Sequence, residues 1–563
     1  MTPKVFICVT VLVLINLKIA SAAESDDPIV ELPEGKIRGQ VLKSEHNKPY
    51  YAFQQIPYAS PPVGTLRFKE PQAPKSWEEV LNTTTNTVVC FQGNTKNTAP
   101  NVEESEDCLY INVYTPLKPG SKATALPVMV WIHGGDFYHG DGTFQSYGPQ
   151  YIIDYGVVVV TFNYRLGPFG FLTAADEVIP ANIGLKDQSF ALQWVNKNIE
   201  LFGGNSSLVT IFGQNTGGVS VGYHLVSTEP KELFRAAIMQ SGTVLSAFGY
   251  QANARHFAFE MGRSLDPSFT STNSKDLLEL LQNASATDIN NAIVDIPSGM
   301  EIGLGNNELV WLPIIENINF TGALITDPMH EDLQNGVFKR VPIMLGYNSE
   351  EQIELIEDDK SLTALGTQLD GNFSLFIRNK FNMSDASKYI AGRALRQIYT
   401  KDVFQKNLVA LVKFMGDEGY TTPIIRHAEL QSKFTDVYLY QFSHKGMLGG
   451  LNLTLTEADW VGDKEDLNYI WSNAKSDTVL SLSDRVTQHR ILKLWTNFVK
   501  YLNPTPDGDK ALLSGDITWP KVTPTNITYL NINRTLEIKT DPKEYQAIKI
   551  IIDRYATSPL VTY

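Results

Sequence analysis

The stretch that decides the fold is Val209-Thr210-Ile211-Phe212-Gly213-Gln214-Asn215-Thr216-Gly217-Gly218. Its first half is apolar and β-branched, which predicts a buried strand. Glycines then flank a turn centred on Asn215, and the small residues from Gly217 to Ser227 predict a helix. Glycine is needed there because strand and helix approach too closely for side chains. The stretch therefore predicts a strand, a tight turn and a helix, with Asn215 at the tip of the turn.

Outward from this stretch, strand and helix signals alternate. Residues 127–132 and 157–162 are continuous apolar runs, which are typical of strands buried on both faces of a parallel sheet. Residues 190–199 have helical spacing and lead into a strand at 208–212. This order is a β-α-β pattern and predicts an α/β fold with a mostly parallel central sheet flanked by helices.

The second half of the chain is more helical. Residues 250–410 are rich in polar helical patterns and predict a cap or inserted lobe. Residues 484–501 predict a long amphipathic helix capped by Ser483. No repeat or low-complexity linker interrupts the chain, so we expect one domain over residues 25–560.

The N-terminus predicts export. Lys4 precedes an apolar run from Val5 to Ile15, and Ala20-Ser21-Ala22 resembles a signal-peptidase site, so residues 1–22 are expected to be a signal peptide. No later segment is long and apolar enough to span a membrane. We therefore expect a secreted, extracellular protein.

The composition excludes some partners. Hydrophobic residues make up 43% of the 563 residues, which indicates a large core, and the formal net charge is −14. Without the two lysines of residues 1–22 the charge becomes about −16. This acidity argues against nucleic acid or an anionic membrane as a partner.

Two features fit an oxidising compartment. Cys8 leaves with the signal peptide, so Cys90 and Cys108 remain and are expected to form a disulfide rather than two free thiols or a metal pair. Nine Asn-x-Ser/Thr sequons follow the signal peptide and are candidates for glycosylation. They are Asn82, Asn205, Asn283, Asn319, Asn372, Asn382, Asn452, Asn526 and Asn533.

Several motifs in a fixed order resemble one family. They are residues 58–64 (YASPPVG) with 66–68 (LRF), 106–116 (EDCLYINVYTP), 163–165 (NYR) with 169–172 (FGFL), 182–188 (NIGLKDQ) and 240–242 (QSG). Together they resemble the type-B carboxylesterase and cholinesterase family, in a pattern nearest to secreted insect carboxylesterases and juvenile-hormone esterase-like proteins. The resemblance implies an α/β-hydrolase fold with a helical cap region and a deep gorge leading to Ser, Glu and His. It also implies that Arg67 pairs with Glu106, and Arg165 with Asp187, to brace loops.

Carried over by motif, the family's catalytic triad is broken twice. The nucleophile position of the Gly-x-Ser-x-Gly elbow is Asn215, and an amide cannot form an acyl-enzyme. The acid is retained as Glu351, within residues 346–352. The base position is Asp463. Residues 445–488 contain no histidine, and the flanking His444 and His489 are poor substitutes.

The oxyanion hole is altered as well. The resemblance assigns its backbone N–H groups to Gly135, Asp136 and Thr216. A carboxylate at Asp136 would repel the charge that develops during acyl transfer. Asp136, Glu351 and Asp463 are all expected to point toward Asn215. We considered three outcomes for them: a shared proton, a bound cation such as Ca²⁺, or an Asp463 that turns to solvent and never meets Glu351.

Three functions remain open on the sequence. The first is a non-catalytic pseudo-esterase that binds an apolar ester-like ligand in the gorge. The second is a cholinesterase-like interaction protein with an extracellular protein partner. The third is a carboxylic ester hydrolase with residual or unorthodox activity. None of the three implies a cofactor or a metal, and the sequence does not indicate an oligomeric state.

Overall fold

The computed structural model describes residues 27–93, 102–229, 231–292, 310–353, 359–377, 381–449, 461–472, 479–506 and 517–563. The expected signal peptide, Cys8 and the sequon at Asn452 lie outside these residues. Among the residues described, no helix is both long enough and apolar enough to cross a membrane.

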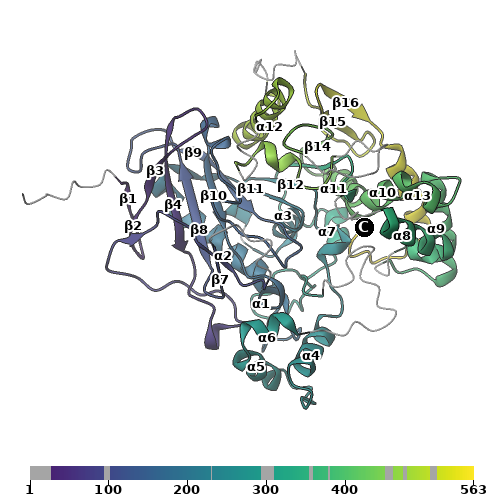
Figure 1. Ribbon diagram of the computed structural model, residues 1–563, viewed down its shortest axis with the longest axis horizontal. Helices are drawn as coiled ribbons and strands as arrows, with labels where there is room; N and C mark the ends of the chain where they lie inside the picture. Colours follow the sequence, from purple (N-terminus) through teal and green to yellow (C-terminus); the bar gives the residue numbers. More distant parts are fainter. Residues whose placement is uncertain are drawn as a thin grey trace, which may run out of the picture.

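A large mixed sheet runs through the centre of the molecule (Figure 1). The neighbouring strands from β10 to β15 are all parallel, and antiparallel strands extend both edges. In spatial order the strands are β16 (Leu536–Thr540), β15 (Thr528–Ile532), β14 (Val437–Phe442), β13 (Ile343–Asn348), β12 (Ala236–Gln240), β11 (Gly204–Gln214), β9 (Leu126–Ile132), β10 (Val158–Phe162), β8 (Tyr110–Thr115), β4 (Pro49–Pro57) and β3 (Gln40–Lys43). The expected mostly parallel α/β sheet is confirmed.

The central strands are buried because helices cover both faces of the sheet. Helix α2 (Ile183–Asn198) connects β10 to β11, and α3 (Thr216–Val226) connects β11 to β12, as the β-α-β pattern predicted. Alternate residues of β9 and β11 enter two separate apolar clusters, one on each face. On one face Trp131 packs on Phe212 with ring centroids 4.8 Å apart. The continuous apolar runs in the sequence arise from this two-sided burial.

The helical lobe differs from the prediction. Residues 250–410 do not form one insertion, because β13 lies within them and joins the central sheet. Two groups of helices result. In Figure 1 the first lies at the bottom and the second at the right. The first comprises α4 (Ala254–Leu265), α5 (Ser274–Asn283) and α6 (Ala286–Asn291); the second comprises α8 (Asp359–Gly371), α9 (Asp385–Tyr399), α10 (Leu408–Gly416) and α13 (Lys543–Tyr555).

The long helix near the C-terminus is confirmed as α12 (Leu482–Tyr501), but its predicted cap was wrong. Ser481, not Ser483, accepts the hydrogen bond from the backbone N–H of Asp484, and the Asp484 side chain returns a bond to Ser481. Ser481 lies two residues before Ser483, and the apolar pattern did not indicate it because Leu482, the first residue of the helix, is 80% exposed.

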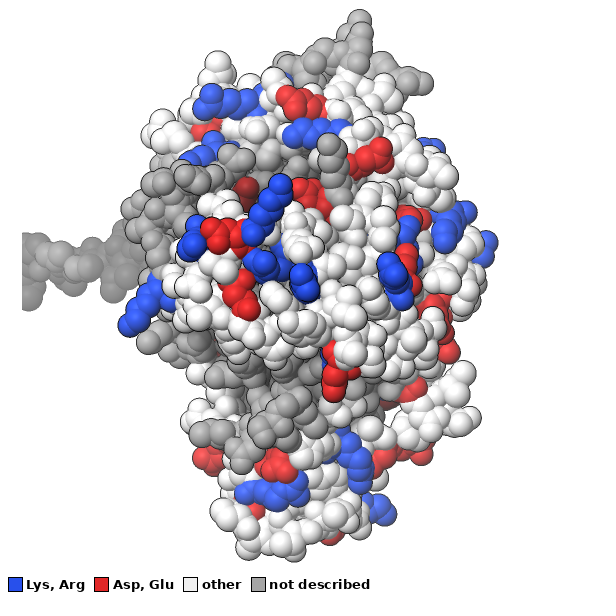
Figure 2. All heavy atoms as spheres, turned by 90° about the vertical axis from the view of Figure 1, so that its right-hand side faces the viewer, with Lys and Arg blue, Asp and Glu red and all other residues white. Residues whose placement is uncertain are grey.

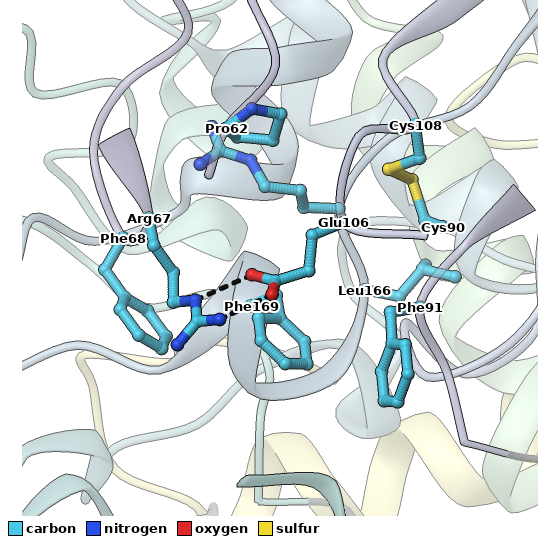
Figure 3. A pocket seen from close by; sticks show the side chains of 10 residues that line it. Pro62, Arg67, Phe68, Cys90, Phe91, Glu106, Cys108, Leu166 and Phe169 are labelled. Carbon is cyan, nitrogen blue, oxygen red and sulfur yellow. Dashed lines mark hydrogen bonds and ion pairs between the residues drawn. A yellow bond between two sulfur atoms is a disulfide. The ribbon is translucent and has the colours of Figure 1, made fainter. Parts of the chain in front are cut away.

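Buried links brace the loops on the β8 side of the sheet. Cys90 and Cys108 form the expected disulfide. Figure 3 shows Arg67 and Glu106 facing each other near it, with nitrogen–oxygen distances of 2.5 and 2.7 Å. Arg165 and Asp187 form a second two-fold pair at 2.6 and 2.7 Å, and the Asp187 side chain is fully buried. These contacts agree with the bracing pairs that the family resemblance implied.

The face formed by the right-hand helices carries mixed charge. In Figure 2, basic and acidic side chains intermingle on this face and leave wide uncharged areas between them. Lys413 of α10 pairs with Glu544 of α13 at 2.7 Å, and Arg396 of α9 lies 3.6 Å from Asp370 of α8. Although the whole chain is acidic, this face therefore does not carry a large patch of negative charge.

Candidate functional site

Asn215 occupies a sharp turn between β11 and α3. Its backbone angles are φ 55° and ψ −126°, a strained conformation outside the left-handed helical region that asparagine commonly adopts. A Cβ on Gly217 would lie 2.1 Å from the carbonyl oxygen of Ile132, and one on Gly213 would lie 2.5 Å from Gly217. The two glycines are therefore required by the close approach of strand and helix, as the sequence predicted.

The side chain of Asn215 turns back onto backbone amides. Its Oδ1 accepts a hydrogen bond from the N–H of Thr216 at 2.6 Å and a longer one from the N–H of Asp136 at 3.4 Å. Backbone N–H groups only donate, so the amide must present its oxygen to them. These are two of the three N–H groups that the resemblance assigned to the oxyanion hole. The Oδ1 of Asn215 thus bonds the N–H groups that would bind the substrate oxyanion in an active esterase.

The other end of the Asn215 amide is also engaged. Its Nδ2 donates to the hydroxyl of Tyr420 over 3.4 Å, and the Asn215 side chain bonds the carboxyl of Asp136. Asn215 is only 4% exposed. The amide is therefore held from both ends in one orientation, which a serine hydroxyl of smaller reach could not reproduce.

Tyr420 was not identified from the sequence. It lies in a π-helical turn, Asp417–Thr421, between α10 and α11 (Thr422–Gln431), and its ring packs on Phe248 at 5.1 Å. Such turns are rare and often occur at functional sites. The apolar helical pattern of the segment gave no sign of the extra residue in the turn, so its proximity to Asn215 could not be predicted.

The loop after β9 supplies the other two predicted donors, Gly135 and Asp136. Gly135 and Asp136 both have positive φ, at 113° and 58°. Within the described residues the N–H of Gly135 makes no hydrogen bond to Asn215; its carbonyl accepts from Tyr138 and His139. Burial raises the pKa of Asp136, while Lys464, His139 and the bond from Asn215 oppose that rise. The pKa of Asp136, beside the Asn215 amide, is thus raised on balance, because burial outweighs these three influences.

Glu351 lies deep in the protein, just after β13. It is 2% exposed, and its Oε1 accepts from the hydroxyl of Ser241 and the N–H of Asn348, each at 2.6 Å. Burial, followed by the charge of Asp463, raises the pKa of Glu351 well above its usual range. Its Oε2 has no hydrogen-bond partner among the described residues. Burial and the neighbouring carboxylate therefore both favour the protonated form of Glu351.

Asp463 is buried as well, at 8% exposure. Its Oδ1 accepts from the side-chain amide of Gln214, the residue before Asn215, and from the N–H of Lys464 at 3.0 Å. Asp463 raises the pKa of Glu351, so the two carboxyls are close enough to interact. The alternative in which Asp463 turns to solvent and never meets Glu351 is wrong.

A further carboxyl, Asp466, joins this pair and was missed in the sequence. It is 1% exposed, and its Oδ2 accepts from the side-chain amide of Gln240 at 2.7 Å and from the Tyr440 hydroxyl at 3.2 Å. Burial raises its pKa. Asp466 begins a short 3-10 turn, Asp466–Tyr469, and the turn before it contains Lys464 with φ 67°, so helical spacing in the sequence could not have indicated its place beside Asp463.

The structure therefore separates the three carboxyls that were expected to meet at Asn215. Asp136 contacts Asn215 directly, whereas Glu351 and Asp463 form a buried cluster with Asp466 that reaches Asn215 through its neighbour Gln214. In the parts of the chain that the structure describes, no group of three or more His, Cys, Asp or Glu side chains is arranged to hold a metal ion. A cation among these carboxyls has no support in this arrangement.

The two histidines nearest in sequence are engaged elsewhere. His444 bonds Oδ1 of Asp484 at 3.1 Å, and His489 bonds the Tyr155 hydroxyl at 3.0 Å. His133, in the loop before Gly135, is fully buried; burial lowers its pKa to about 4, and its ring stacks on Tyr164. The two flanking histidines are thus bonded to residues other than Asp463, which occupies the predicted base position.

Comparison with known proteins shows which family has this fold. The model of the carboxylesterase family matches residues 26–548, which is nearly the whole chain. The chain belongs to the carboxylesterase family. Juvenile hormone esterase of Tribolium castaneum is 32% identical, and the match covers 94% of this chain and 93% of that protein. Venom carboxylesterase-6 of Apis mellifera is 30% identical, with 91% and 92% covered.

Solved structures agree with the fold of this family member. The juvenile hormone esterase of Manduca sexta, solved with OTFP covalently attached, is 26% identical and superimposes with a TM-score of 0.79, covering 94% of this chain and 99% of that one. A structure titled PNB esterase gives a TM-score of 0.72. The α/β-hydrolase fold of the esterases is therefore confirmed for this chain.

Proposed function

We propose that this carboxylesterase-family protein is an exported pseudo-esterase, folded like its relatives but unable to hydrolyse esters. The observation that carries the proposal is the side chain of Asn215. It replaces the nucleophilic hydroxyl with an amide, and its oxygen bonds the N–H groups of Thr216 and Asp136. An incoming carbonyl would have to displace this oxygen before either amide could stabilise an oxyanion.

The electrostatics support the same proposal. In the family mechanism a histidine takes the proton of the nucleophile, and an acid orients that histidine. Here the acid position holds Glu351 with a raised pKa, and the base position holds Asp463. Two neighbouring acids can share a proton but cannot activate a nucleophile as a neutral imidazole does.

We propose further that the protein binds an apolar ester-like ligand without turning it over. Support comes from its similarity to juvenile hormone esterase of Tribolium castaneum and from the aromatic rings of Phe248 and Tyr420 beside Asn215. Such a ligand would be held by apolar contacts and would gain little from its carbonyl oxygen, since the amides that would bind it are occupied.

The test has two arms on the purified full chain. A p-nitrophenyl ester assay, with an active family esterase as positive control and heat-treated protein as blank, should show no hydrolysis above the blank. Binding of radiolabelled juvenile hormone by equilibrium dialysis should be saturable and should return the hormone intact. Turnover would contradict the loss of catalysis. Absence of both turnover and binding would refute the ligand and favour a protein partner.

A further inference from the structure

A polar pocket lies away from Asn215, at the carboxyl ends of three neighbouring parallel strands. Ser349, Ser443 and Asn533 directly follow β13, β14 and β15, and all three line it. Its volume is about 310 Å³, at the lower end of the range for small-molecule sites. In open α/β sheets, this edge is where ligands usually bind.

The walls of the pocket have two kinds of surface. Helix α10 presents Val409, Val412 and Lys413, whose spacing places them on one face of the helix. The strand side presents the polar side chains of Gln441 and Asn531. The Ser443 hydroxyl donates to Oδ1 of Asn531 at 2.7 Å, so within the described residues the Asn531 amide nitrogen remains as a donor.

The charge of the pocket favours a neutral ligand. Lys413 and Lys539 line it, but so does Glu350, and Lys413 is paired with Glu544 at 2.7 Å. An anion site would require several unpaired cations that converge on one point. A patch of valines opposite amides and hydroxyls instead suits a sugar, which has apolar C–H faces and a rim of hydroxyl groups.

The pocket also contains an attachment point for a sugar. Asn533 begins the sequon Asn533-Arg534-Thr535, which forms the three-residue turn of the β15–β16 hairpin. Oδ1 of Asn533 accepts the N–H of Arg534 at 2.8 Å, and no described residue bonds its Nδ2. A sugar attached to this nitrogen would be tethered at the pocket wall, so it would need no affinity of its own to occupy the pocket.

We propose that Asn533 carries an N-linked glycan whose first N-acetylglucosamine lies in this pocket, against Val409 and Val412. The amide nitrogen forms a bond to C1 of the sugar and loses a proton, and the lipid pyrophosphate that carried the oligosaccharide leaves from C1. The seated sugar joins α10 to the β15–β16 hairpin and stabilises that edge of the sheet. The proposal is independent of whether Asn215 is catalytic.

The experiment uses the full chain secreted from insect cells. Glycopeptide mass spectrometry should find Asn533 occupied. An endoglycosidase that leaves a single N-acetylglucosamine is then applied to the parent and to the variants Asn533→Gln, Thr535→Ser and Asn526→Gln. Thr535→Ser keeps the sequon, and Asn526 is an exposed sequon residue just before β15 that does not line the pocket. Amide hydrogen exchange is measured over residues 408–416 and 536–540.

Asn533→Gln should lose protection in both segments, whereas trimmed parent, trimmed Thr535→Ser and trimmed Asn526→Gln should keep it. In the sugar-bearing protein, Val409→Ser, at a half-buried residue that lines the pocket, should cause the same loss, and it should add nothing to Asn533→Gln. An unoccupied Asn533, or equal exchange in trimmed parent and Asn533→Gln, would overturn the proposal. Saturable binding of free phosphate by protein with a bare Asn533 would also overturn it, by showing an anion site.

Discussion

Replacing Asp463 by asparagine should make the stability of this protein less dependent on pH. Glu351 is 2% exposed, and its pKa is raised well above its usual range by burial and then by Asp463. Asparagine keeps an oxygen that can accept from Gln214 and from the N–H of Lys464, so those two bonds survive. The substitution removes the charge that opposes ionisation of Glu351.

The direction of this change in stability with pH follows from the number of protons bound in each state. An acid whose pKa is raised in the folded state binds more protons there than in the unfolded chain, so the free energy of unfolding falls as pH rises. The fall begins near the unfolded pKa of about 4.3 and ends at the folded pKa of Glu351. One extra proton in the folded state corresponds to about 1.4 kcal/mol per pH unit. Without the charge of Asp463, the fall should end at a lower pH.

The assay is urea unfolding from about pH 4 to about pH 8, for parent, Asp463→Asn, Glu351→Gln and the double variant. Asp332 and Asp417, whose pKa values burial raises to about 7 and about 6, titrate in all four proteins and cancel in the differences. Asp463→Asn should gain stability over parent as pH rises, and should gain much less in the Glu351→Gln background. Parallel pH profiles for parent and Asp463→Asn would refute the coupling of these two carboxyls.

Three further predictions concern the residues that stabilise the fold and the amide of Asn215. Glu106→Ala should lower the free energy of unfolding by about 3 kcal/mol or more, because it leaves Arg67 largely buried without its partner. Asp436→Ala, which breaks the exposed pair with Lys521, should lower it by less than about 1 kcal/mol. Cys90→Ala should lower it by about 3 kcal/mol in urea unfolding, and an unchanged midpoint would contradict a structural disulfide. Asn215→Ala, which frees the N–H groups of Thr216 and Asp136, should bind octanoate more tightly than parent in calorimetry, whereas Asn215→Asp should not; equal affinities would show that the amide oxygen does not block those groups.

The sequence predicted the fold wherever two-sided burial or close backbone approach left a local pattern. The runs in β9, β10 and β11 and the glycines around Asn215 are examples, because each residue type there is dictated by its immediate neighbours. The amphipathic pattern did not extend into the exposed first turn of α12, so Ser481 was missed as its cap. The split of the helical lobe by β13 was missed because a single short strand has little periodicity.

The site was predicted less completely, for a different reason. The identities at Asn215, Glu351 and Asp463 could be taken from motifs, but their partners depend on long-range contacts. Tyr420 reaches Asn215 across 205 residues, and Gln240 reaches Asp466 across 226. The rotamer of Asn215, which turns its oxygen onto Thr216, is likewise set by the folded environment and not by sequence.

The most direct measurement of whether this carboxylesterase-family protein has lost its chemistry is covalent labelling by a fluorophosphonate probe, read as intact mass. We expect no adduct on the parent and none on Asn215→Ser, because the base position still holds Asp463 and no histidine activates the new serine. Asn215→Ser combined with Asp463→His should label slowly, and an active family esterase should label fully. A stoichiometric adduct on the parent chain would contradict the account.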